Sequence, residues 1–278
     1  MNSLKARIQE AIRQIAVILQ FYRSAVTIYD IHSPSIFRFI RFVEDTSRHY
    51  YKLSQLRGYA SYRASSIPEN QEIDDAELME IKRRKKPASI KPTWTSLGML
   101  FRVLVYKNPK TIVLWGGTPD IETLAILLGA SDKCQLYIYT DCVAELKEYI
   151  YQFTSFGQKP KPLVDIAYYS MIDGWVPEQI DLAIMGVGTT ISNTESRTFT
   201  KLQHRMKPKS MYLMLDVFQS KMRIAVWNKL RRAMFSGTAI CFYRMCTFHK
   251  ELTDRKDIHI VPLILKPWRI GLWGQMPR

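Results

Sequence analysis

Two adjacent glycines, Gly116 and Gly117, follow an apolar run in this sequence. The run at 111–115 predicts a buried strand. Thr118-Pro119-Asp120 completes the turn, and the pattern of 120–129 predicts a helix. A strand, a glycine turn and a helix start form the layout in which a loop cradles a phosphate or a nucleotide cofactor. These residues are therefore the first candidates for ligand binding.

Other kinds of chemistry leave no recognisable pattern. The four cysteines form no C-x-x-C pair, and no histidine stands at zinc-ligand spacing, so we predict no metal site. The sequence contains neither a nucleophile elbow with a Ser-His-Asp order nor a Walker-type lysine loop. We read the cysteines as reduced thiols of a cytoplasmic protein.

The elements that must position the glycine turn recur regularly. Strands alternate with helices every 20 to 30 residues, which favours right-handed βαβ crossovers on a mostly parallel sheet. The β-rich end of the chain predicts an antiparallel hairpin that closes the sheet. The expected strands are 111–115, 135–140, 164–169, 181–185, 211–215, 239–243, 247–248 and 258–265, and the expected helices are 4–29, 34–51, 95–106, 120–129, 143–154, 195–206 and 221–234.

Composition divides the 278 residues into four parts. We expect an N-terminal helical extension at 1–58, a charged connector or lid at 59–92, a Rossmann-like domain at 93–265 and a basic, aromatic tail at 266–278. The extension has a helical apolar stripe that would pack on the domain or on a second copy of the chain. The sequence shows neither a signal peptide nor an apolar run long enough to span a bilayer.

The net charge of +15 suits attraction to nucleic acid, anionic lipid or an acidic protein. The surplus is uneven, since residues 201–278 hold 16 basic and 4 acidic side chains. The densest basic run, Lys82 to Lys86, is either a solvated loop or part of an anion-binding surface. Trp268 and Trp273 are interleaved with basic residues, a pattern that suits stacking on bases, a membrane interface or a tail folded onto the body.

Four stretches carry a resemblance to a family. They are His32-Ser33-Pro34 with Ile36 to Ile40 and the Tyr50-Tyr51 pair; Leu100 to Tyr106 leading to Pro109 to Ile112; the turn Gly116-Gly117-Thr118 ending in Ile121-x-Thr123-Leu124; and Met245 to Leu252 with His259. On these residues the chain resembles class I S-adenosylmethionine-dependent methyltransferases, and more narrowly a bacterial group with a helical N-terminal extension. The resemblance covers roughly residues 25–265.

The resemblance implies a seven-stranded, mostly parallel sheet with an antiparallel C-terminal strand. It also implies that S-adenosylmethionine binds at the carboxyl ends of the strands. Methyl transfer is an in-line displacement in which positioning supplies much of the acceleration, so it requires no fixed catalytic residue. We therefore assign no catalytic residue.

Carried over residue by residue, the family's cofactor motifs are degenerate here. The first motif, acidic-x-Gly-x-x-x-Gly, falls on Leu114, Gly116 and Asp120. Asp120 would bind the ammonium group of the cofactor or would cap the next helix. The acid that closes the second strand, which in the family accepts hydrogen bonds from both ribose hydroxyls of the cofactor, falls on Thr140, with Asp141 next to it.

The remaining motif positions lie after the later strands. The acid that meets the adenine falls on Ser170 or Met171, and the acid after the fourth strand falls on Gly186. The first of a pair of acids after the fifth strand is kept as Asp216, either a substrate contact or a helix cap. His32 would orient an N-terminal loop against the pocket or make a structural hydrogen bond.

Three functions remain open on these grounds. The first is a methyltransferase, or a methyltransferase-like protein, with a weakened cofactor site and an acceptor that is small or macromolecular. The second is a catalytically inactive interaction protein with a basic surface. The third is a binder of nucleic acid or an anionic surface through 82–86 and the tail.

Overall fold

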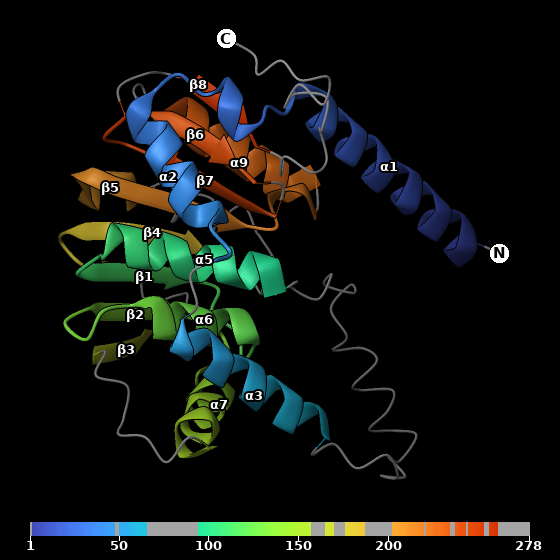
Figure 1. Cartoon of the computed structure of the whole chain (residues 1–278). Coiled ribbons are helices and arrows are strands. Elements are labelled where there is room, and N and C mark those ends of the chain that lie inside the picture. Colours follow the sequence, from blue (N-terminus) through green and yellow to red (C-terminus); the bar gives the residue numbers. More distant parts are fainter. Residues whose placement is uncertain are drawn as a thin grey trace.

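The computed structural model describes residues 2–47, 50–65, 94–156, 165–169, 176–186, 202–219, 221–233, 237–242, 244–252 and 256–260. Within them, one mixed sheet is covered by helices (Figure 1). Its strands are β1 (Thr111–Trp115), β2 (Gln135–Tyr139), β3 (Asp165–Tyr169), β4 (Ile180–Met185), β5 (Met206–Leu215), β6 (Thr238–Cys241), β7 (Met245–His249) and β8 (Lys256–His259).

The strand order is β3-β2-β1-β4-β5-β7-β6-β8. All neighbours are parallel except β7, which runs antiparallel to β5 and to β6. The Rossmann-like α/β fold and the antiparallel hairpin are thus confirmed. The described sheet has eight strands, as many as the sequence pattern predicted and one more than the resemblance implied, and the last of them, β8, is a parallel edge strand beside β6.

Helices on one face of the sheet bury the larger hydrophobic cluster. These are α2 (Pro34–Glu44), α3 (Tyr51–Ser65), α5 (Trp94–Lys107), α6 (Ile121–Gly129) and α7 (Val143–Phe156). Alternate strand residues such as Leu114 and Ile138 point into this cluster. Because side chains alternate across a strand, their neighbours face the other side.

The second face of the sheet packs against α9 (Lys221–Ala233) and the end of α1 (Asn2–Ser24). Phe21 is buried there, and the amide of Val26 donates to the carbonyl of His259 at 2.7 Å. The earlier part of α1 extends away from the sheet (Figure 1), and Ile12, Ile15 and Leu19 are exposed. No helix among the described residues is long and apolar enough to span a membrane.

Several boundaries differ from the sequence prediction. The helix expected to reach residue 51 ends at Glu44, because Asp45 Oδ1 accepts hydrogen bonds from the amide and hydroxyl of Ser47 and forms a turn. A separate helix, α3, then crosses the expected domain boundary at residue 58 and runs to Ser65. Near the expected helix 195–206, Leu202–Arg205 forms a 3₁₀ turn, η2, and β5 already begins at Met206. Most of the connector and the whole tail lie outside the described residues.

Candidate functional site at the carboxyl edge of the sheet

The glycine turn lies where the strand order reverses, with β2 on one side of β1 and β4 on the other. Gly116 has a φ of 76°, a conformation that glycine adopts without a side-chain penalty. Its amide donates to the carbonyl of Tyr139 at 2.8 Å, and a Cβ on Gly117 would lie 2.6 Å from Cγ2 of Ile138. Both glycines therefore hold the turn closely against β2. Open α/β sheets bind ligands at this kind of reversal.

Asp120 caps α6. Its Oδ1 accepts the amide of Thr123 at 2.8 Å, and its Oδ2 accepts the hydroxyl of Thr118. The Thr123 hydroxyl in turn donates to the carbonyl of Thr118 at 2.7 Å. The capping interpretation of Asp120 is confirmed, and both of its oxygens already have partners inside the turn.

Thr140 and Asp141 follow β2 and differ in environment. Thr140 is buried, and its hydroxyl donates to the carbonyl of Gly117 at 2.6 Å while accepting the amide of Cys142 at 3.2 Å. Asp141 is exposed. The position of the ribose-binding acid therefore holds a hydroxyl that fastens the β1 turn, and the neighbouring carboxylate faces solvent.

Gly186 follows β4 and touches the glycine turn. Its amide donates to the carbonyl of Trp115 at 2.8 Å, and a Cβ at this position would lie 2.7 Å from the carbonyl oxygen of Gly116. Arg223 of α9, which is buried, donates through Nη2 to the carbonyls of Gly186 at 2.9 Å and Leu215 at 2.6 Å. Burial lowers the pKa of the Arg223 guanidinium to about 10, and nearby Asp216 opposes that shift.

Asp216, at the end of β5, is paired rather than acting as the helix cap that was weighed for it. Its carboxylate receives two hydrogen bonds from Arg244, at 2.8 Å from Nε and 2.9 Å from Nη2. The amide of Asp216 also donates to the carbonyl of Arg244 at 2.6 Å. A bidentate pair with so little exposure fixes both side chains.

Glu122, in the first turn of α6, completes an acidic group with Asp120 and Asp216. Burial raises the pKa of Glu122 to about 8, the two aspartates add to the rise and Arg244 opposes it. Glu122 is thus mostly protonated at neutral pH. A cavity of about 10 Å³ lies here, lined by Ser96, Leu97, Leu100, Glu122, Leu215, Asp216, Arg244 and Met245.

Glu122, Arg223 and Arg244 were missed by the sequence analysis. For Arg223 a signal existed, since it shares its helical spacing with the buried Val226, Trp227 and Leu230. Arg244 stands in a short hairpin between two apolar strands, and nothing in its local pattern points to Asp216.

The other predicted residues are placed less centrally. His32 is exposed before α2, and among the described residues no hydrogen bond joins it to this edge. Ser170 and Met171 lie outside the described residues. Trp115 is buried and stacks on Tyr139 at a centroid distance of 4.8 Å, and Tyr139 stacks on Tyr169 at 5.3 Å. In the described part of the chain, no group of three or more metal-ligating side chains could hold a metal ion.

Comparisons with known proteins give distant structural similarity. The sequence matches no protein-family profile and no curated protein. Among solved structures, the chain is similar to a methyltransferase from Geobacter sulfurreducens, with a TM-score of 0.47, 10% identity and coverage of 70% of this chain and 97% of that one. It is also similar to an O-methyltransferase from Bacillus cereus in complex with SAH, with a TM-score of 0.44, 10% identity and coverage of 71% of this chain and 100% of that one. A third similar structure is the SAH-bound methyltransferase PaMTH1 of Podospora anserina, with a TM-score of 0.44, 13% identity and coverage of 78% of this chain and 96% of that one.

Proposed function

We propose that the chain binds S-adenosylmethionine at the carboxyl edge of the sheet and acts as a methyltransferase with a weakened cofactor site. The observation that carries this proposal is the position of the Gly116 turn at the strand-order reversal, beside the capped start of α6. Ligands bind at that position in open α/β sheets. The four stretches of sequence that resemble class I methyltransferases add support.

The acidic group fits the cationic end of this cofactor. The cofactor carries positive charge on its sulfonium and ammonium groups, and it would supply the methyl group. Glu122, Asp120 and Asp216 lie together at the start of α6 and the end of β5. A cation next to Glu122 favours its carboxylate and would displace the proton that burial retains. The proposed role of these residues is to hold the cofactor in line with an acceptor, small or macromolecular.

The ribose end of the cofactor fits less well, which is why we describe the site as weakened. The Thr140 hydroxyl is bonded to Gly117, so Asp141 is the remaining carboxylate next to this position. Each missing charge-assisted hydrogen bond costs about 1.5–3 kcal/mol. Every ~1.4 kcal/mol is a factor of ten in affinity.

A second candidate is a catalytically inactive interaction protein. The Arg244 guanidinium occupies both oxygens of Asp216, which favours this candidate because a cation is already in place there. The exposed Ile12, Ile15 and Leu19 of α1 also favour it, since their spacing of three and four residues gives the helix an open apolar face. A protein partner or a second copy of the chain would pack there.

Calorimetric titration with S-adenosylmethionine and with its demethylated product separates the two candidates. The methyltransferase proposal predicts micromolar binding that tightens between pH 6 and pH 8.5, because the cation displaces the proton of Glu122. Asp141→Asn should weaken binding, whereas the matched change Asp132→Asn, also at an exposed position, should not. No heat and no shift in Tm at millimolar ligand would remove the proposal and leave the interaction protein. In that case Ile15→Asp should lower the mass measured by analytical ultracentrifugation.

A further inference from the structure

The amino edge of the sheet, opposite the carboxyl edge, contains an irregularity that places lysines at the surface. Met206 of β5 pairs with Ile180 of β4, and the next pair is Met211 with Leu182. Between these pairs β5 has four residues, 207–210, where β4 has one, 181. The additional residues of Lys207-Pro208-Lys209-Ser210 must leave the ladder, and Pro208 has no amide hydrogen to donate to it.

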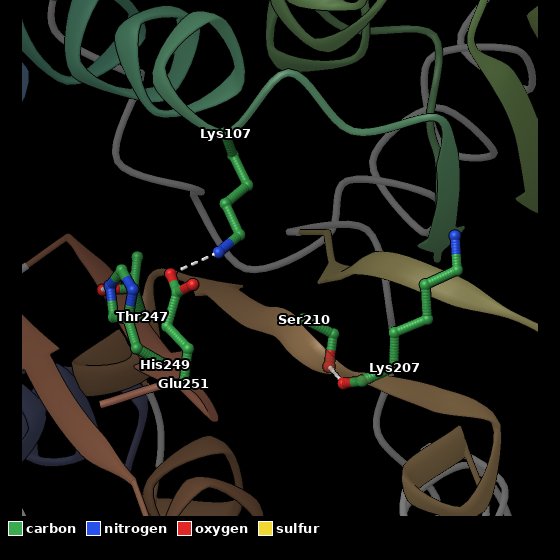
Figure 2. Close-up of polar contacts among 6 residues, drawn as sticks. All are labelled: Lys107, Lys207, Ser210, Thr247, His249 and Glu251. Atoms are coloured by element: carbon green, nitrogen blue, oxygen red, sulfur yellow. Dashed lines mark hydrogen bonds and ion pairs between the residues drawn. The ribbon is translucent and has the colours of Figure 1, made fainter. Parts of the chain in front are cut away.

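The bulge is held in a defined shape. The hydroxyl of Ser210 donates to the carbonyl of Lys207 at 2.5 Å, an interaction that Figure 2 shows. Nζ of Lys250 donates to the carbonyl of Met206 at 3.2 Å, and Nζ of Lys207 lies 2.8 Å from Oδ1 of Asp181. The exposed side chain of Lys209 therefore projects from an anchored backbone.

The carboxylates at this edge are largely engaged. Oδ2 of Asp181 accepts the amides of Lys110 and Thr111, both at 3.0 Å, in addition to the ion pair at Oδ1. Glu251 pairs with Lys107 at 2.6 Å (Figure 2).

Three cations at this edge have no such partner. Lys110, Arg205 and Lys209 are exposed, and no carboxylate among the described residues lies within ion-pair distance of them. They come from three segments: the entry to β1, the 3₁₀ turn η2 and the β5 bulge.

Two adjoining grooves connect these cations. One, of about 680 Å³, is lined by Glu178, Gln179, Asp181, His204, Arg205, Met206, Lys207, Pro208 and Lys209. The other, of about 580 Å³, is lined by Tyr106, Lys107, Asn108, Pro109, Lys110, Asp181, Lys207, Lys209 and Glu251. They share Asp181, Lys207 and Lys209. Each groove contains one exposed ring, that of His204 in the first groove and that of Tyr106 in the second.

We propose that this double groove binds single-stranded nucleic acid, with phosphates on Lys110, Lys209 and Arg205 and a base on the ring of Tyr106. Cations spread over two grooves suit an extended chain of phosphates better than one phosphate group. Exposed rings beside basic side chains are the usual means by which proteins hold single strands without reading sequence. RNA and DNA share this chemistry. The proposal does not rest on the methyltransferase proposal, which concerns the opposite edge.

The test is fluorescence anisotropy of the full chain with labelled 20-nucleotide oligo(U) and oligo(dT) between 50 and 200 mM KCl. Wild-type binding should weaken steeply with salt. The variant Lys110→Glu/Arg205→Glu/Lys209→Glu should bind at least about 30-fold more weakly, and the slope of log K against log salt should fall in magnitude by about 0.7 for each phosphate that the variant no longer neutralises. Glu178→Gln, which removes an exposed acid from the lining of the first groove, should strengthen binding.

The control variant Arg41→Glu/Lys52→Glu/Lys229→Glu carries the same change in charge at exposed positions of α2, α3 and α9. Its affinity should fall only as far as the loss of net charge predicts, to within about threefold. Its affinity should therefore stay well above that of the variant Lys110→Glu/Arg205→Glu/Lys209→Glu. Equal losses in the two variants would show a general effect of charge and overturn the proposal, and so would absence of wild-type binding. All six positions are exposed, so circular dichroism should show both variants folded.

Discussion

The candidate ligand-binding side chains at the two edges of the sheet differ in whether they have partners within the protein. At the carboxyl edge, Asp120, Thr140 and Asp216 each bond to the protein itself. At the amino edge, Lys110 and Lys209 are exposed without a carboxylate partner among the described residues. The carboxyl edge has the topology of a ligand site and, among the described residues, a cavity of only about 10 Å³, while the amino edge has two larger grooves without a resemblance to any motif.

The comparison shows that the edge whose topology suits a ligand need not be the edge whose candidate contacts are exposed. Topology places the Gly116 turn correctly, but a ligand there must compete with internal hydrogen bonds. Lys110, Arg205 and Lys209 at the amino edge need no such exchange, because their side chains are exposed and have no ion-pair partner among the described residues. Changes at Asp120, Thr140 and Asp216 should therefore affect stability, whereas changes at Lys110, Arg205 and Lys209 should affect binding with little effect on stability.

The largest expected effect is at the Asp216–Arg244 pair. Arg244→Leu should lower the free energy of unfolding by about 3 kcal/mol, because it leaves the little-exposed Asp216 beside Glu122 without its bidentate partner. Lys107→Met removes a more exposed pair with Glu251 at the amino edge and should cost at most about 1 kcal/mol. Urea denaturation followed by circular dichroism measures both, and equal costs would contradict the contrast between the edges.

The next effect concerns the close approach of Gly186 to Gly116. Gly186→Ala should destabilise the protein by about 2 kcal/mol, because the new Cβ meets a backbone oxygen at 2.7 Å and separates β4 from β1. Gly58→Ala is the matched change in the interior of α3, where the Cβ meets only Phe156 at 4.0 Å. It should stabilise by about 0.5–1 kcal/mol through helix propensity. If Gly186→Ala left the free energy of unfolding unchanged, the backbones of Gly186 and Gly116 could not approach each other as closely as the structure shows.

A smaller effect depends on pH through Glu122. Its pKa is about 8 in the folded protein against 4.5 for the free side chain, so the folded state keeps a proton that the unfolded state loses between these values. The contribution of Glu122 to stability is thus lost as the pH rises from about 4.5 to about 8. Glu122→Gln should become more stable relative to the wild type over this range, by more than about 1 kcal/mol at pH 8.5. A stability difference between Glu122→Gln and the wild type that stays constant over this range would contradict the assigned pKa.

The smallest expected effect on stability is at the amino edge. Lys209→Ala should change the free energy of unfolding by less than about 0.5 kcal/mol, because its side chain is exposed and the bulge is held by Ser210 and Lys207. Thermal unfolding measures this. A larger loss would show that Lys209 supports the fold rather than a ligand.

Local sequence signals predicted the first half of the domain well. β1 has the predicted limits, 111–115, and α6 begins directly after Asp120. These elements depend on apolar periodicity, a glycine turn and a cap, all of which are encoded within a few residues. The α3 helix was missed because Gly58 and its serines hide a short buried face made of Leu56 and Tyr59.

The sequence by itself determined the alternation of strands and helices from β1 to α7, the glycine turn and the basic surplus, and it allowed the cap at Asp120 as one of two alternatives. Only the tertiary structure decided that Arg244 reaches Asp216, that Thr140 fastens Gly117 and that the lysines of the β5 bulge stand beside Lys110. The physical reason is range: caps and periodicity act between neighbours in the chain, whereas these interactions join residues that only the packing of the sheet brings together.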